Sequence, residues 1–164
     1  MTLNNSKSII NLKLTRRISL VLFLTFLVLT WVAKIIKYPL LGINETGWTL
    51  IILAVFLLIL IIPLMLNYNY VYYSDEGENI NLKYFSTGLI PGNKNAVEIN
   101  KRTFSGFTLD KKYFGLVQSI ILYQRMREGV AKYPPIYINA LRKDQRNKII
   151  KSLNSFAPLI KSKE

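Results

Sequence analysis

The sequence predicts a membrane protein with an α+β domain, in which a hairpin of two membrane-spanning helices precedes a small bent antiparallel β-sheet or barrel capped by a C-terminal helix. Three observations predict this fold. Residues 48–66 are apolar and uncharged, residues after Asn67 alternate with a period of two, and apolar residues recur at helical spacing between Lys143 and Phe156. The expected parts are a basic cytoplasmic segment over 1–17, the helical hairpin over 18–66 and a cytoplasmic domain over 67–164.

The second hydrophobic segment, from Trp48 to Leu66, is the clearest feature of the sequence. It contains no charged residue, and at ~1.5 Å per residue it is long enough for a hydrocarbon core of ~30 Å. The alternative is the buried helix of a soluble core. A domain of this size cannot surround such a helix, so we predict a membrane span over about 48–66.

The first hydrophobic segment runs from Ile18 to Ala33 and reaches spanning length if it continues to Ile36. Lys34 would then extend its apolar stem along the helix and place its charge at the interface. A cleaved signal peptide is the alternative, but the small-x-small cleavage pattern is missing after the apolar run. We therefore predict a retained span over about 18–36.

The basic residues predict the orientation of the two spans. Four of them precede the first span, two lie at the start of the connecting loop, and the others follow the second span. The positive-inside rule then places both termini in the cytoplasm. The expected anchors at the membrane interfaces are Arg16, Arg17, Trp31, Lys34, Lys37 and Trp48.

The domain after the hairpin begins with a predicted pair of strands. Residues 68–73 alternate with a period of two, residues 80–85 do the same, and Ser74-Asp75-Glu76-Gly77 is typical of a turn. Further strands are expected over 96–99, 103–109, 116–127 and 135–138. The amphipathic helix over 143–156 is expected to cover the sheet with its apolar stripe; binding of that stripe to the membrane is the alternative.

This order of elements, with Tyr72-Tyr73-Ser74-Asp75-Glu76-Gly77 and Pro135-Ile136-Tyr137-Ile138 as its local sequences, resembles bacterial membrane proteins with a pleckstrin-homology-like domain. The resemblance covers nearly the whole chain through pattern and element order. It implies a strongly bent sheet capped by a helix, no catalytic activity, no cofactor, and a multi-pass location in the bacterial inner membrane. One departure is Arg142, which stands where the family often has a Ser or Thr helix cap.

The reactive side chains that many enzymes use are missing. The sequence has no Cys and no His, which excludes disulfides, thiolate ligands, cysteine nucleophiles and imidazole bases. The acidic residues Asp75, Glu76 and Glu78 could hold a calcium ion, but a solvated turn explains them without one. We expect neither an enzyme nor a metal or cofactor site.

The formal net charge of +13 favours contact with an anionic partner. The basic surface is either an adaptation to the anionic cytoplasmic leaflet or a patch that binds head groups or a protein. No recognition motif for nucleic acid accompanies the charge, so none is expected as a partner. The candidate contacts for lipid or a partner are Lys101, Arg102, Lys111, Lys112, Arg125, Arg127, Arg142, Lys143 and Arg146.

These observations predict a non-catalytic, membrane-anchored interaction module that serves as an accessory or scaffolding subunit of a bacterial inner-membrane complex. Its expected partners are membrane phospholipids and other membrane protein subunits. The alternative is a peripheral sensor that binds anionic lipid head groups through the basic domain. A small membrane enzyme or transporter is a third possibility, for which the sequence offers no catalytic constellation.

Overall fold

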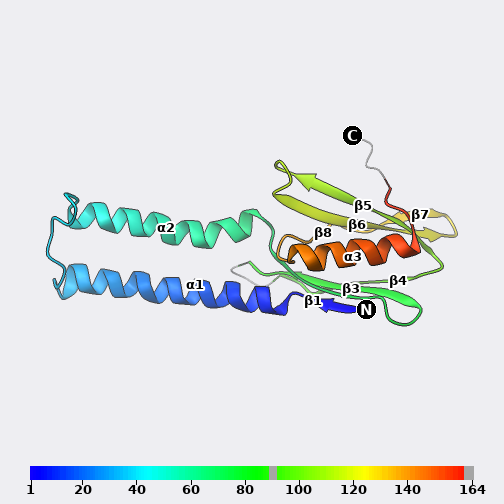
Figure 1. Cartoon of the computed structure of the whole chain (residues 1–164), viewed down its shortest axis with the longest axis horizontal. Helices are drawn as coiled ribbons and strands as arrows, with labels where there is room; N and C mark the ends of the chain where they lie inside the picture. Colours follow the sequence, from blue (N-terminus) through cyan, green and yellow to red (C-terminus); the bar gives the residue numbers. More distant parts are fainter. Residues whose placement is uncertain (89–91, 161–164) are drawn as a thin grey trace. The chain divides into compact units, whose positions relative to one another are not determined.

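A computed structural model describes residues 1–88 and 92–160 and divides the chain into two units. The helical unit consists of Ile10–Met65. The β-rich unit combines Met1–Ile9 with the chain from Leu66 onward, so it is built from two separate stretches of sequence (Figure 1).

The helical unit contains two helical segments joined by an irregular connection. α1 covers Ser6–Leu27 and continues as a π-helical turn over Val28–Val32, while α2 covers Glu45–Met65. The rings of Phe23 and Phe56 stack with their centroids 5.0 Å apart. The prediction that the first helical segment continues to Ile36 is wrong: the helix ends at Val32 with Ala33 as its cap, and Lys34 takes a φ of 49°.

α2 is the one helix among the described residues that is long and apolar enough to cross a membrane. α1 differs because Lys7, Lys13, Arg16 and Arg17 lie in its N-terminal half, so its uncharged stretch is shorter. The first predicted span, over about 18–36, therefore stays a prediction, and so does the hairpin of two membrane spans.

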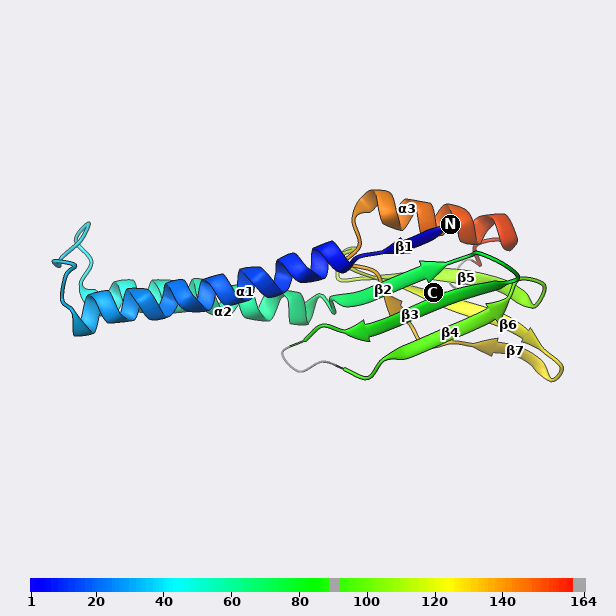
Figure 2. The ribbon, with the colours of Figure 1, turned by 90° about the horizontal axis from the view of Figure 1, so that it is seen from below.

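The first sheet of the β-rich unit has the antiparallel order β1-β2-β3-β4 (Figure 2). These strands cover Thr2–Asn4, Asn69–Ser74, Asn79–Ser86 and Asn95–Asn100. The predicted strand pair is confirmed as β2 and β3, joined by the turn at Asp75–Glu78. Alternate residues of both strands are buried, which is the cause of the period-two pattern.

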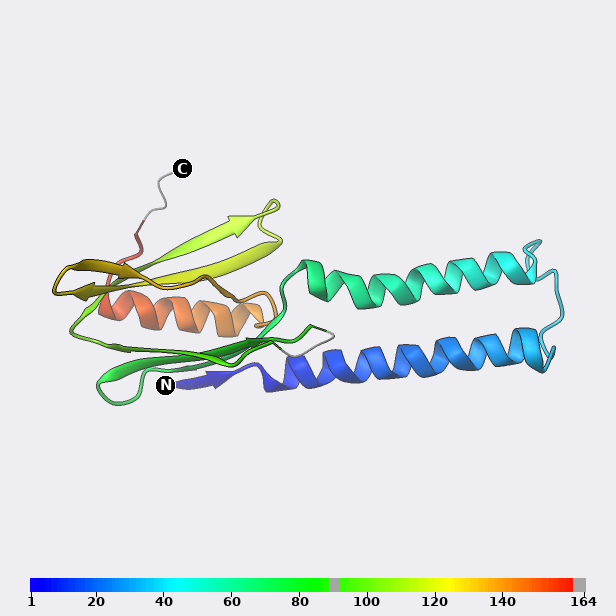
Figure 3. The ribbon, with the colours of Figure 1, turned by 180° about the vertical axis from the view of Figure 1, so that it is seen from behind.

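The second sheet has the order β5-β6-β7, and β8 pairs with the other part of β6. Its strands cover Phe104–Lys112, Val117–Met126, Gly129–Lys132 and Ile136–Tyr137. Within the described residues the β-strands thus form two antiparallel sheets, where the sequence predicted one bent sheet or barrel. β5 and β6 form a long hairpin whose turn is Tyr113–Leu116 (Figure 3).

α3 covers Lys143–Phe156, as the spacing of its apolar residues predicted. Ile149 and Leu153 are fully buried in one core with residues of both sheets, such as Ile80 and Leu122. Gln145 accepts a hydrogen bond from the backbone N–H of Arg142 at 3.2 Å, so an amide side chain satisfies one backbone donor at the helix start.

The strand β1 was not predicted, because three residues are too few to display a period. It pairs with β2 from Thr2↔Ser74 to Asn4↔Tyr72. Immediately after it, the buried side chain of Asn5 donates to the carbonyl of Asn69 and accepts from the N–H of Val71, both at 2.8 Å. The N-terminal residues are therefore part of the β-rich unit, and not only a basic segment that leads into the first helix.

Candidate functional site

The turn between β2 and β3 holds the first cluster of polar groups, which we call the acidic-turn cluster: the Met1 amine, Tyr73, Asp75, Lys101 and Ser152. The carboxylate of Asp75 pairs with the Met1 amine on one oxygen and accepts from the Ser152 hydroxyl on the other. Since Ser152 donates to Asp75, its oxygen accepts from the Tyr73 hydroxyl, 2.6 Å away. Each oxygen of the Asp75 carboxylate thus has a hydrogen-bond partner within the fold.

Two pKa values reflect this arrangement. Burial raises the pKa of Tyr73 to about 12, an effect that the hydrogen bond with Ser152 only partly offsets. Burial by itself raises the pKa of Asp75, but the hydrogen bonds from the Met1 amine and Ser152 and the nearby positive charges hold the pKa of that carboxyl below its ordinary value. The cluster therefore favours a neutral tyrosine and an ionised aspartate.

Lys101, a candidate lipid contact, belongs to this cluster. Its ammonium donates to the carbonyls of Asp75 and Gly77, each at 2.7 Å, and lies 4.7 Å from the ring centre of Phe156. Within the described residues, no group of three or more acidic side chains is placed to hold a metal ion. These contacts explain the acidic turn by its role in the fold.

The other candidate contacts are distributed over the β-rich unit. Arg102 lies in the turn before β5, Arg125 and Arg127 lie at the β6–β7 hairpin, and Arg142 precedes α3. Lys112 is 3.7 Å from the carboxylate of Asp110.

The expected interface anchors fall in the helical unit. Trp31 donates its indole N–H to Thr49 at 3.1 Å, and Trp48 donates to the carbonyl of Leu40 at 3.0 Å. Arg16 and Arg17 lie on α1, whereas Lys34 and Lys37 lie in the irregular connection.

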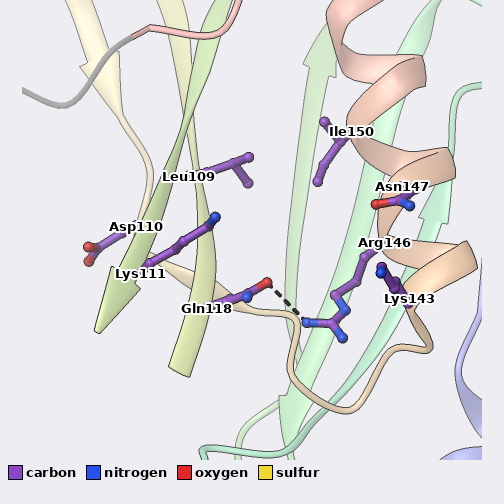
Figure 4. A pocket seen from close by; sticks show the side chains of 8 residues that line it. All are labelled: Leu109, Asp110, Lys111, Gln118, Lys143, Arg146, Asn147 and Ile150. Atoms are coloured by element: carbon purple, nitrogen blue, oxygen red, sulfur yellow. Dashed lines mark hydrogen bonds between the residues drawn. The ribbon is translucent and has the colours of Figure 1, made fainter. Parts of the chain in front are cut away.

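Three of the candidates, Lys111, Lys143 and Arg146, line one cavity of about 290 Å³ between the β5–β6 hairpin and the first turns of α3 (Figure 4). We call it the basic cavity. Its remaining walls are Leu109, Asp110, Gln118, Asn147 and Ile150. Among residues 1–88 and 92–160, none of its three cations forms an ion pair with a carboxylate, and the Nε atom of Arg146 is buried without a hydrogen-bond partner.

Gln118 connects this cavity to its surroundings through hydrogen bonds of its side chain and of its backbone N–H. Its side-chain oxygen accepts from Arg146 at 3.0 Å and its amide donates to the carbonyl of Gly115 at 3.1 Å. Its backbone N–H donates to the side chain of Asn139 at 2.8 Å, and Asn139 donates to the carbonyl of Leu66. Leu66 is the first residue after α2, so the cavity is bonded to the point where the chain enters the β-rich unit from that helix.

Sequence reasoning identified the cations of the cavity but not Gln118, Asn139 or Asn147. The polar residues have no charge and no motif spacing, and they meet only because α3 packs beside the β5–β6 hairpin. The register Lys111↔Gln118 places one of the cations directly opposite the glutamine. Gln118 could have been identified from the sequence if the pairing of these two strands and its register had been predicted.

Comparison with known proteins gives no relative for this arrangement: no family model, no curated protein and no solved structure matches the chain.

Proposed function

We propose that the chain is a non-catalytic interaction module, held in a bacterial inner membrane by α1 and α2 and exposing a pleckstrin-homology-like domain to the cytoplasm. The pairing of β1 with β2 is the observation that supports this most strongly. It keeps Asn4 and Tyr72 in one sheet, and hence on one side of any membrane. If α2 crosses the membrane once, the chain must cross it a second time between these residues, and α1 is the segment available for that crossing.

The surface of the helical unit supports the same proposal. Large apolar side chains remain exposed along the uncharged part of α1, including Val21 at 61% and Leu22 at 64%, and along α2, including Leu50 at 61%. A soluble protein rarely leaves so extensive an apolar surface in contact with water. Lipid chains are a suitable environment for these side chains, and the basic residues at the start of α1 favour a cytoplasmic N-terminus.

The polar groups of the β-rich unit support a binding role over a catalytic one. The carboxylate and hydroxyls of the acidic-turn cluster satisfy one another, and the sequence offers no thiol or imidazole. A protein surface of another membrane subunit is the partner that we favour for this domain.

Labelling of single cysteines tests the two crossings, because the chain has no native cysteine. Ile35→Cys lies in the irregular connection and is 67% exposed, whereas Val130→Cys lies on β7 and is 57% exposed. In intact spheroplasts, a membrane-impermeant reagent should label the first variant and leave the second unlabelled until the cells are opened. Equal labelling of both variants in intact cells contradicts the two-span anchor.

Affinity purification in mild detergent tests the role as a subunit. We expect a stoichiometric membrane partner to elute with the full chain, and the partner should be lost when the β-rich unit is replaced by an unrelated domain on the same helices. A chain that consistently elutes alone contradicts the subunit proposal.

The basic cavity favours a second candidate function, the binding of anionic lipid head groups. Its three cations have no carboxylate partner in the part of the chain that the structure describes, and they surround a space large enough for a phosphate group. Each basic residue near an anionic membrane gains about 1 kcal/mol. The full chain in nanodiscs of different lipid composition tests this function. If binding of the β-rich unit to the nanodisc surface changes neither with the content of anionic lipid nor with the salt concentration, the electrostatic basis of this function is removed.

A further inference from the structure

The turn of the β5–β6 hairpin exposes an apolar tip formed by Tyr113, Phe114 and Leu116. Their exposed fractions are 72%, 109% and 66%, so the ring of Phe114 is fully exposed among residues 1–88 and 92–160. Water is an unfavourable environment for three neighbouring large apolar side chains. This exposure indicates that the tip contacts an apolar surface outside the chain.

The backbone of this turn is strained at the two aromatic residues. Tyr113 and Phe114 have φ values of 50° and 55°, in the left-handed region, and Gly115 N–H donates to the carbonyl of Lys112 at 3.1 Å. β-Turns with positive φ at both central residues favour Asn-Gly or Gly-Gly, because small or polar residues adopt positive φ at lower cost. Aromatic residues at both positions weaken the turn, which indicates a role in contact with another surface.

The basic cavity adjoins the apolar tip on the same hairpin. Lys111 precedes the tip on β5, and Gln118 follows it on β6 and bonds to both Gly115 and Arg146. Lys143 reaches the same space from α3 (Figure 4). An apolar tip beside a group of cations matches the surface of an anionic membrane, in which phosphates lie directly above the acyl chains.

The tip and the cavity also lie at the end of the β-rich unit where the chain arrives from α2. The Gln118 side chain donates to the carbonyl of Gly115, its backbone N–H donates to Asn139, and Asn139 donates to the carbonyl of Leu66. These hydrogen bonds connect the tip to the first residue after that helix. Leu66 lies at the membrane boundary when α2 spans the bilayer. The end of the unit that contains this residue is then joined directly to the anchor, within reach of the lipid head groups.

We propose that the apolar tip enters the head-group layer of the membrane and that the basic cavity binds the phosphate of an anionic phospholipid. This inference rests on the proposed anchoring by α2 and adds a second attachment, which fixes the orientation of the β-rich unit against the bilayer. The occupant is a phospholipid surface, because the aromatic tip needs an apolar layer that a free phosphate ion does not offer.

A fluorescent label on a single cysteine tests this contact in the full chain, reconstituted in nanodiscs that contain lipids with a quencher on the acyl chain. Phe114→Cys places the label at the tip. Val130→Cys is the matched control, since it is also exposed and apolar but lies on the β6–β7 hairpin, at the other end of β6. We expect quenching at position 114 that increases with anionic lipid, and no such change at position 130.

Charge removal tests the cavity. Replacement of Lys111 and Lys143 by alanine should reduce the ratio of docked to undocked tip by roughly fivefold per charge. The matched control replaces Lys148 and Lys151, which are exposed on the same helix outside the basic cavity, and should leave that ratio nearly unchanged. An equal effect of the two double variants would overturn the assignment of the cavity.

The other outcomes are equally decisive. Equal quenching at positions 114 and 130, or quenching that ignores anionic lipid, contradicts the docking of the tip. Protection of position 114 in native membranes but not in pure-lipid nanodiscs assigns the tip to a protein partner and also overturns the proposal. Failure of the chain to enter nanodiscs contradicts the anchor itself, which separates the two proposals.

Discussion

The acidic-turn cluster and the basic cavity lie in the same unit but differ in how their charges are paired. Asp75 has the Met1 amine, Ser152 and the charge of Lys101 around it, whereas the cations of the cavity have no carboxylate partner within the described part of the chain. Both clusters involve α3, the first near its end and the second near its start. The comparison indicates that the paired cluster stabilises the fold, and that the unpaired one is available to bind.

The largest effect should follow from Asp75→Asn. The variant keeps the size of the side chain but removes the charge that receives hydrogen bonds from the amine and from Ser152, and hydrogen bonds to charged groups contribute about 2 kcal/mol. We expect a loss of about that size in the free energy of unfolding, measured by thermal or urea denaturation in detergent.

The neighbouring Glu76→Gln is the control for this variant. Its side chain is 67% exposed and lies 3.6 Å from the same amine, so we expect a loss below about 1 kcal/mol. Similar losses for both variants would show that the acidic-turn cluster does not depend on Asp75.

The pH dependence of stability tests whether the ionised carboxylate of Asp75 stabilises the fold. Because the folded-state pKa of Asp75 is lowered, its contribution is present above the unfolded-state value of about 4 and is lost as the pH falls through the folded-state pKa. The difference in stability between the wild type and Asp75→Asn should therefore be constant near neutral pH and shrink in acid. A difference that persists at low pH contradicts the role of the ionised carboxylate.

Gln118→Ala should have an intermediate effect, because it disrupts contacts of the basic cavity without removing a charge. It deletes the bonds to Arg146 and Gly115 but keeps the backbone bond to Asn139. We expect a loss of about 1 kcal/mol in unfolding free energy and faster hydrogen exchange at residues 113–116. Exchange that stays unchanged at this turn would mean that Gln118 does not hold the tip.

Lys143→Ala should have the smallest effect on stability. Its side chain is exposed, and it lies beside two other cations, so we expect a change within about 0.5 kcal/mol of zero. Denaturation of the same full-length protein measures it. A loss as large as that of Asp75→Asn would show that the two clusters are alike and would remove the basis of the comparison.

The sequence predicted the elements whose periodicity reflects burial. The bounds of α3 were predicted to the residue because Ile149 and Leu153 recur on one face, and β2 and β3 were predicted because alternate residues face the core. β1 and β7 were missed, since each is short and β7 is largely exposed. Local pattern has nothing to detect in such strands.

The candidate site was predictable only in part. The positive charges were visible in the sequence, but their grouping depends on the packing of α3 beside β5 and β6, which brings together residues far apart in the chain. The apolar tip at Tyr113 and Phe114 was not predicted either. It lies between two expected strands, and only the structure shows that the described residues leave it uncovered.

The N-terminal strand has a consequence for the biosynthesis of this chain. The side chain of Asn5 donates to the carbonyl of Asn69, which is synthesised 64 residues later. This hydrogen bond can form only after Asn69 has been added to the chain. The sheet therefore closes only after both helices have left the ribosome. A fragment that begins after α2 would expose the edge of β2 as a template for aggregation, so a soluble version of the domain needs residues 1–9 joined to it by a linker in place of the helices.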